Sequence, residues 1–296
     1  MRVLVFSGTT EGREAAARCL SLGFDTTVSV ASGYGRELAE EDGGNVKILE
    51  NRLSEGEMVE LFKSFDCVVD ATHPFALEVT ANIKAACASV GLPCLRFLRS
   101  GPDSAFGGAV PFRADGSDFF EFDSLEDLCR GLSAFERNLL EKNLPLPNVF
   151  VSTGSKNLEC FRSLISFEER FFFRVLPSVD SIRLCQAAGI RSRNIIAMQG
   201  PFSESLNEAM FRETHAGVLV TKESGRNGGF DEKVSAARKC GMKIFSVRRP
   251  VEGGYNVFEN IEDLEKELKK LDERRVLDRD RDGESGRPHC GGGKAH

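Results

Sequence analysis

Short apolar runs alternate with amphipathic stretches along most of this chain. Each run is about four to eight residues long and ends in glycine, proline or polar residues, which is typical of a buried strand. We predict strands at 2–7, 25–31, 46–49, 67–70, 94–97, 119–122, 148–152, 171–175, 194–198, 217–221 and 243–247. We predict helices at 11–22, 75–90, 124–141, 156–165, 179–188, 204–213, 230–240 and 261–271. Strands that alternate with helices form parallel βαβ units, so the pattern predicts an α/β fold.

Residues 100–118 interrupt this alternation because they are rich in Gly, Pro, Asp and Ser and lack periodicity. We interpret them as the connection between two domains, since 296 residues exceed the usual size of one. The predicted domains are 1–100 and 101–273. From Arg274 onward the chain is charged and then rich in glycine, so we predict a disordered tail over 274–296.

Composition narrows the class of protein. Hydrophobic residues make up 41% and charged residues 28%, with a net charge of −6, which argues against nucleic acid or a membrane surface as the main partner. No window is apolar enough to span a membrane, and a strand begins at once with no signal peptide, so we expect a cytoplasmic protein. The nine cysteines are spread singly, which favours reduced thiols over disulfides, and we expect no metal site.

The loop after the first strand, residues 7–13, carries the first candidate chemistry. It reads Ser-Gly-Thr-Thr-Glu-Gly-Arg and opens a helix, although it does not match G-x-G-x-x-G. Gly8 permits a tight turn, Thr9 and Thr10 offer hydroxyls, and the helix N-terminus attracts a pyrophosphate. The alternative is an ordinary capped turn with Thr10 as N-cap.

The loop after the second strand bears on which dinucleotide would bind. No acid occurs between Val28 and Arg36 to hold the ribose hydroxyls, as NAD sites usually require. Ser29, Ser32 and Arg36 instead suit a 2′-phosphate, so NADPH is favoured and NADH stays an alternative. Arg36 can equally be a surface residue beside its neighbouring acids.

Residues 67–75, Cys-Val-Val-Asp-Ala-Thr-His-Pro-Phe, form the most informative stretch. Three apolar residues stop at an acid, a hydroxyl, an imidazole and a proline, as at a buried strand that ends in a loop. We expect Asp70, Thr72 and His73 to face a ligand crevice, because ligands bind at the carboxyl ends of parallel strands. His73 is a candidate ligand contact or proton donor, or a structural residue.

The second half repeats polar strand ends and adds positive charge. Residues 151–200 carry seven bases and four acids. Lys156 follows the Ser-Thr-Gly-Ser sequence at 152–155, Arg174 precedes Val-Leu-Pro, and Lys222 and Ser224 end a further strand. Such groups in register indicate a site for a large anionic ligand, with Lys222 as a point charge for a carboxylate or phosphate. A solvated face of mixed charge is the alternative.

Several of these segments together resemble the precorrin-6A reductase family of cobalamin biosynthesis, which includes the cobalt-precorrin-6A reductases. The matching segments run in family order at 8–13, 70–76, 93–96 with Arg99, 152–155, 174–177, 199–203, 221–222 with 224–225, and 249–250. The chain departs from the family at Glu223, where Asp is usual, and at Ser100, where Pro is usual. The segment 101–147 and the tail do not match clearly.

The resemblance implies two Rossmann-like domains with mainly parallel sheets and a cleft between them that binds NAD(P)H. The implied reaction reduces the C18–C19 double bond of precorrin-6A or its cobalt form, with hydride to C19 and a proton to C18. Implied cofactor contacts are Gly8, Thr9, Thr10, Glu11, Arg13, Ser29, Ser32, Asp70, Thr72 and His73. Implied substrate contacts are Lys156, Arg174, Lys222 and Ser224, with Lys222 or His73 as proton donor.

Two other hypotheses stay open at the level of sequence. One is a different NAD(P)-dependent reductase of a polyanionic substrate. The other is a dinucleotide sensor without enzymatic activity, because a fold does not fix a function. The sequence also leaves open whether the substrate contains cobalt, and whether the protein is a monomer or a homodimer.

Overall fold

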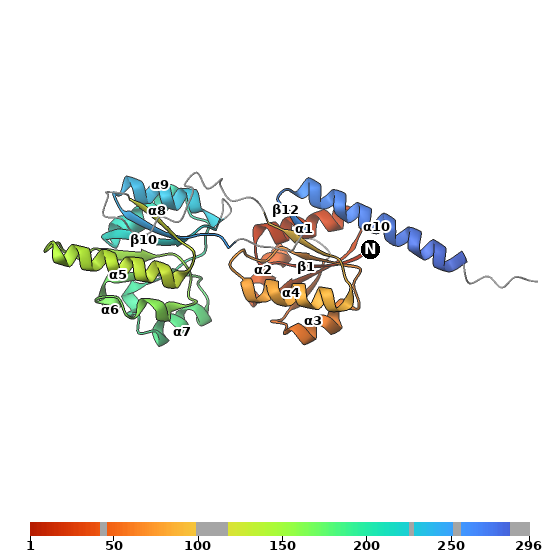
Figure 1. The fold of residues 1–296 in the computed structure, drawn as a ribbon, viewed down its shortest axis with the longest axis horizontal. Helices are drawn as coiled ribbons and strands as arrows, with labels where there is room; N and C mark the ends of the chain where they lie inside the picture. The colour runs from red at the N-terminus through yellow and green to blue at the C-terminus, as the bar shows by residue number, and fades with distance from the viewer. Residues whose placement is uncertain (42–45, 99–117, 225–227, 251–255, 285–296) are drawn as a thin grey trace, which may run out of the picture. The chain divides into compact units, whose positions relative to one another are not determined.

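A computed structural model describes residues 1–41, 46–98, 118–224, 228–250 and 256–284. The chain divides into two compact units (Figure 1). The first unit contains the described parts of Met1–Arg99 and Glu252–His296, and the second contains those of Ser100–Val251.

The sheet of the first unit has six parallel strands in the order β12-β5-β4-β1-β2-β3. Their bounds are β1 Arg2–Phe6, β2 Asp25–Val30, β3 Lys47–Glu50, β4 Cys67–Asp70, β5 Cys94–Phe97 and β12 Asn256–Phe258. This is the 3-2-1-4-5-6 order of a dinucleotide-binding domain, with β12 as the sixth strand. The strand order reverses between β1 and β4, where such domains hold their ligand.

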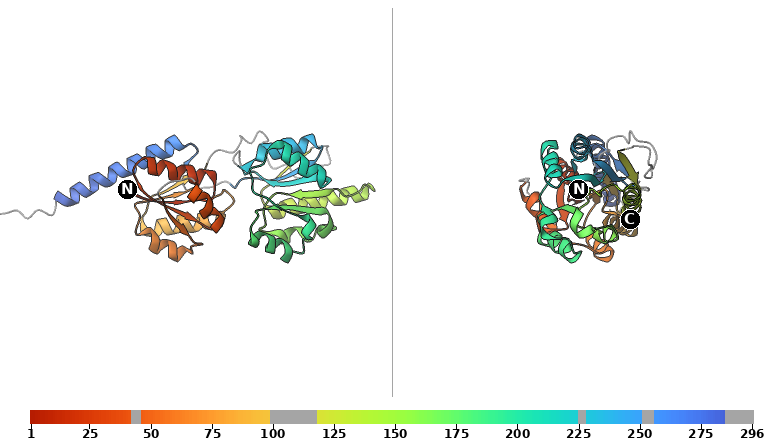
Figure 2. Two further views of the ribbon diagram at one scale, coloured as in Figure 1. Left: turned by 180° about the vertical axis from the view of Figure 1, so that it is seen from behind. Right: turned by 90° about the vertical axis from the view of Figure 1, so that its left-hand side faces the viewer.

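Helices cover both faces of this sheet because its strands alternate between two apolar sides. Val3 and Val5 pack with helices α1 and α10, whereas Leu4 and Phe6 pack with α3 and α4. Figure 2 shows α1 and α10 on one side of the sheet and α3 and α4 on the other. The helices are α1 Thr10–Ser21, α2 Gly33–Glu41, α3 Glu55–Phe62, α4 Leu77–Val90 and α10 Ile261–Glu284. Continuously apolar strands with both faces covered are what a parallel sheet requires.

The second unit also has six parallel strands, in the order β6-β11-β10-β7-β8-β9. They are β6 Phe119–Phe122, β7 Asn148–Val151, β8 Phe171–Val175, β9 Ile195–Ala197, β10 Ala216–Lys222 and β11 Lys243–Val247. Counted from β7 as the first strand, the strand order of this sheet also reverses between the first and fourth strands, β7 and β10. Its ligand-binding edge is therefore expected where β7 and β10 end.

The two faces of the second sheet have different cores. Phe150, Leu219 and Ile244 pack under α8 and α9. The opposite face is rich in phenylalanine, with Phe161 against Phe171 and Phe173. The helices of this unit are α5 Leu125–Glu141, the 3-10 helix η1 Leu158–Phe161, α6 Phe167–Arg170, α7 Val179–Ala187, the 3-10 helix η2 Ser192–Asn194, α8 Glu204–Glu213 and α9 Phe230–Lys239.

The predicted α/β fold with parallel sheets is confirmed, but the structure places residues 256–273 in the first unit and not in the second. Strand β12 pairs with β5, and Ile261, Leu264 and Leu268 of α10 belong to the core of the first unit. The segment from 256 therefore completes the first unit instead of ending the second. The expected tail at 274–296 is also wrong in part, because α10 continues to Glu284; residues 285–296 lie outside the described residues.

Local differences from the sequence prediction are few. The helix expected at 156–165 is only the short helix η1, which follows Asn157, a residue with a left-handed backbone and φ of 60°. Helices α2 and α3 were not predicted. Most of the connection expected at 100–118 lies outside the described residues.

Candidate active site

The turn between β1 and α1 is fixed to the end of β4. Gly8 has φ of 141°, a conformation that favours glycine. The hydroxyl of Thr9 accepts the N–H of Gly12 at 3.2 Å and donates to the carbonyl of Ala71 at 2.9 Å. A Cβ on Gly12 would lie 2.7 Å from Cα of Ser7, so only glycine lets the helix start this close to the strand. The turn thus links the ends of β1 and β4, between which the strand order reverses.

This turn fits a pyrophosphate group. Helix α1 has 12 residues, and its N-cap is Thr9 instead of the expected Thr10. Thr10 is exposed, while Glu11 and Arg13 are half-buried. Helix N-termini present N–H groups and a partial positive charge. Because the backbone at Gly8 carries no side chain, an anion can approach these N–H groups closely.

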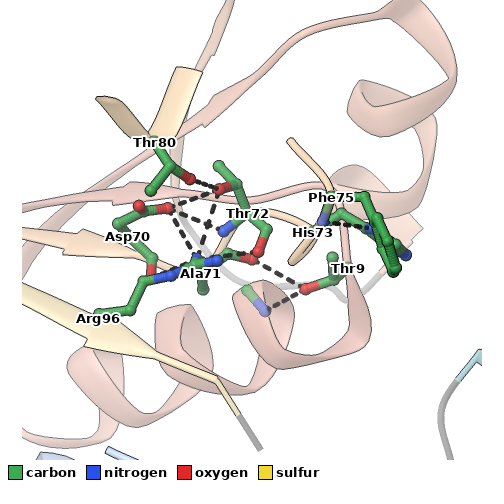
Figure 3. Close-up of polar contacts among 9 residues, drawn as sticks. Thr9, Asp70, Ala71, Thr72, His73, Phe75, Thr80 and Arg96 are labelled. Atoms are coloured by element: carbon green, nitrogen blue, oxygen red, sulfur yellow. Dashed lines mark hydrogen bonds and ion pairs between the residues drawn. The ribbon is translucent and has the colours of Figure 1, made fainter. Parts of the chain in front are cut away.

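The end of β4 is organised by a buried ion pair (Figure 3). Asp70 and Arg96 are both fully buried, with Nη1 of Arg96 at 3.0 Å from Oδ1 of Asp70. The same Nη1 donates to the carbonyl of Thr72 at 2.9 Å, and Oδ1 of Asp70 accepts both the N–H and the hydroxyl of Thr72. The Thr72 hydroxyl also lies 3.0 Å from that of Thr80. Asp70 and Thr72 therefore hold the loop from below, where a ligand cannot reach the Asp70 carboxylate directly.

His73 lies on the surface of this loop. Its Nδ1 accepts the N–H of Phe75 at 3.2 Å, which leaves the proton of a neutral imidazole on Nε2. Its ring centroid is 5.8 Å from that of Phe75. His73 is exposed, so of the three side chains expected at this strand end it is the one that a ligand can contact.

The loop after β2 presents fewer side chains to a ligand than its sequence suggests. Ser29 is buried within the strand, and the hydroxyl of Ser32 caps the first turn of α2 by accepting an N–H at 3.2 Å. Arg36 pairs with Glu40 at 2.8 Å and with Glu50 at 3.8 Å. These ion pairs are exposed and therefore weak, so Arg36 can turn to a ligand phosphate at little energetic cost.

In the second unit, Lys222 ends β10 and is half-buried. Burial lowers the pKa of its ammonium, Lys156 lowers it further, and Cys160 and Glu126 raise it. Lys156, which is exposed, therefore lies close enough to Lys222 for the two charges to interact. The hydroxyl of Ser224 donates to the carbonyl of Gly228 at 3.4 Å, within its own loop.

Arg174 lies on the other face of the same sheet. Its side chain is 7% exposed, and Nη1 donates to Oδ1 of Asn207 on α8 at 2.7 Å. The guanidinium lies 4.1 Å from the ring centre of Phe202 and 5.4 Å from that of Phe150. Burial lowers the pKa of Arg174 to about 10. The structure thus separates Arg174 from Lys156 and Lys222, which neighbour η1 and α5.

Sequence reasoning gave no role to three residues that shape these sites: Arg96, Asn207 and Lys233. In the sequence, Arg96 stands out only as part of the segment 93–96, which resembles the family. Lys233 had a usable signal, because Phe230, Val234 and Ala237 mark the buried face of α9 and Lys233 falls on the same face.

The two parallel sheets, each with polar groups where its strand order reverses, define an α/β protein of the Rossmann-like class. The chain belongs to the precorrin-6x reductase family CbiJ/CobK, whose model matches residues 2–269. It is therefore an oxidoreductase of cobalamin biosynthesis. Among the described residues, no helix is long and apolar enough to cross a membrane.

Curated relatives agree with this assignment. The cobalt-precorrin-6A reductase of Methanothermobacter thermautotrophicus is 34% identical, over 92% of this chain and 84% of the relative. That of Priestia megaterium is 30% identical, over 88% of this chain and 96% of the relative. The solved structure of a CobK precorrin-6A reductase superposes with a TM-score of 0.67 at 22% identity, covering 92% of this chain and 97% of that one, which supports the fold.

Proposed function

We propose that this enzyme reduces the C18–C19 double bond of precorrin-6A or cobalt-precorrin-6A with NADPH. The observation that carries the cofactor assignment is the turn at Gly8 and Thr9, which is fixed where the first sheet reverses its strand order. NADPH supplies the hydride for C19 when bound. The chain's own residues bind and orient the two reactants and deliver a proton to C18.

The first unit supplies the cofactor contacts in this proposal. Gly8, Thr10 and the first N–H groups of α1 hold the pyrophosphate, and Thr9, Glu11, Gly12 and Arg13 shape the turn. Ser32 and Arg36 lie at the adenosine end, above the buried Ser29. His73 and the Thr72 backbone line the nicotinamide side, while Asp70 and Arg96 position that loop from beneath.

The second unit supplies the contacts for the ring carboxylates, through Lys156, Lys222 and Ser224 on one face and Arg174 on the other. Lys222 is the preferred proton donor because a lowered pKa makes its ammonium a better acid near neutral pH. His73 is the second candidate, through its Nε2 proton.

Turnover and cofactor binding, measured separately, test this proposal. We expect the purified enzyme to oxidise NADPH with precorrin-6A or its cobalt form, and not with simple enones. Lys222→Ala should lose turnover and keep its Kd for NADPH, while Lys142→Ala, an exposed lysine at the end of α5, should retain both. Unchanged turnover in Lys222→Ala would remove Lys222 from the site. Tight NADPH binding without turnover on any tetrapyrrole would favour the sensor hypothesis.

A further inference from the structure

Two cations are buried on the α8–α9 face of the second unit. Arg174 on β8 is 7% exposed and Lys233 on α9 is 6% exposed. In the part of the chain that the structure describes, neither makes an ion pair with a carboxylate. The charged groups that act on Lys233 are Arg174, which repels it, and Glu232, an exposed neighbour on its own helix.

Burying two positive charges near enough to repel each other is unfavourable unless something compensates them. Burial, reinforced by Arg174, lowers the pKa of Lys233 to about 7, and burial lowers that of Arg174 to about 10. If Lys233 only filled space in the core, methionine or leucine would fill the same space without the free-energy cost of burying an ammonium group.

The guanidinium of Arg174 is oriented by its neighbours and has N–H donors left for an anionic ligand. The guanidinium donates to Asn207, whose own amide is fixed by the carbonyls of Phe202 and Ser203 at 3.2 Å and 2.9 Å. The guanidinium carbon lies over the ring of Phe202. A guanidinium has five N–H groups, and the bond to Asn207 uses one of them, so most of its donors can serve a ligand.

Arg174 and Lys233 lie near the carboxyl edge of the sheet, where parallel α/β folds bind ligands. Arg174 is next to the last residue of β8, at the carboxyl edge of the sheet. The N-cap of α9, Gly229, has φ of 62°, and a Cβ there would lie 3.8 Å from the backbone of Phe202. The first turn of α9 and the Phe202 segment therefore meet at this edge, with Lys233 one turn into the helix.

We propose that Arg174 and Lys233 form a buried subsite for one anionic oxygen group, separate from the pair Lys156 and Lys222. The identification of the bound group as a carboxylate of the macrocycle rests on the proposed function. A phosphate of the cofactor is also an anionic oxygen group that these two cations can bind. Lys233 lies in the binding machinery and is not assigned to proton transfer.

The test compares Lys233→Met with Lys239→Met, an exposed lysine on the same helix that pairs with Glu204. A hydrogen bond between charged groups contributes enough that we expect Lys233→Met to weaken binding about 10- to 100-fold. If the group is a ring carboxylate, KM for the tetrapyrrole rises and Kd for NADPH does not change. If it is a cofactor phosphate, Kd for NADPH rises instead. Equal constants in Lys233→Met and wild type overturn the subsite.

Lys233→Arg separates charge from packing. It keeps the positive charge, so KM should stay within about threefold of wild type. Ligand binding to wild type near pH 7 should take up protons as Lys233 becomes charged, and in Lys233→Arg this uptake should fall, as measured by calorimetry in two buffers of different ionisation enthalpy. Equal proton uptake in both proteins contradicts the role of Lys233.

Inorganic phosphate provides a test that does not depend on the proposed reaction. Phosphate should raise the Tm of wild type and of Lys239→Met, and raise it less in Lys233→Met and Lys233→Arg/Arg174→Met. A phosphate shift that is smaller in Lys233→Met than in wild type, in an enzyme that turns over no tetrapyrrole, would refute the proposed function and keep the subsite. Equal phosphate shifts in all four proteins would refute the subsite whatever the reaction is.

Discussion

Replacing Arg96 with methionine leaves the Asp70 carboxylate buried at the end of β4 without its positive partner. Both side chains are fully buried, and Arg96 also donates to the carbonyls of Asp70 and Thr72 at 3.1 Å and 2.9 Å. Methionine has a similar length, so the change removes charge and hydrogen bonds with a smaller change in packing. The loop that carries His73 loses its support from below.

The expected loss of stability in Arg96→Met is large because the charge of the Asp70 carboxylate stays buried. Removing one partner of a buried ion pair destabilises by about 3–5 kcal/mol. At about 2–4 °C of Tm per kcal/mol for a unit of this size, the transition of the first unit should fall by about 6–20 °C. Replacing Asp70 as well, in Arg96→Met/Asp70→Asn, removes the buried charge and keeps an oxygen that can accept from Thr72. We expect the double variant to recover at least half of the loss.

Calorimetry and urea unfolding of the three proteins measure these differences. Arg18→Met serves as the matched control, because Arg18 pairs with Glu265 at a partly exposed site in the same unit and should cost less than about 1 kcal/mol. A loss below about 1 kcal/mol in Arg96→Met, or an equal loss in the single and double variants, would refute the reasoning from a buried charge.

Three further predictions concern the same unit. Gly12→Ala should raise Kd for NADPH more than about tenfold, because the added Cβ would lie 2.7 Å from the Cα of Ser7 and displace the turn; fluorescence titration measures this. Arg36→Ala should raise Kd for NADPH and leave Kd for NADH unchanged, since Arg36 can pair with a 2′-phosphate. Leu264→Ala should destabilise the first unit by about 2–5 kcal/mol in urea, because its side chain is fully buried in that core.

Matched variants control each of these measurements. Gly56→Ala in α3 places its Cβ in open space and should be neutral or stabilising. Lys47→Ala removes an exposed charge of the same sheet and should leave both dinucleotide constants unchanged. Leu140→Ala, at a side chain that is 48% exposed in the second unit, should cost little. A variant that behaves like its control contradicts the corresponding prediction.

The sequence predicted the strands well because each parallel strand is a short apolar run with a sharp polar end. It failed where a segment depends on a distant partner. Strand β12 has three residues, and only its pairing with β5 makes it a strand. For that reason the sequence did not assign residues 256–273 to the first unit. Helix α3 has a local signal in the sequence, because Ser54 and Glu57 form a capping box.

The candidate sites show the same division. Gly8 and Thr9 could be read from the sequence because a βα turn is local. The role of Asp70 could not, because it depends on Arg96, which lies 26 positions further along the chain. The proposed subsite of Arg174 and Lys233 likewise combines β8 with α9, and no spacing rule connects those two elements.

The central claim is tested most directly by isotope transfer. NADPH that carries deuterium at the transferred position of C4 is incubated with the enzyme and precorrin-6A or its cobalt form, and the product is analysed by mass spectrometry. The account predicts one deuterium per reduced macrocycle, bound at C19, with one NADPH oxidised for each product formed. A reduced macrocycle without deuterium, or NADPH oxidation without reduction of the ring, would contradict it.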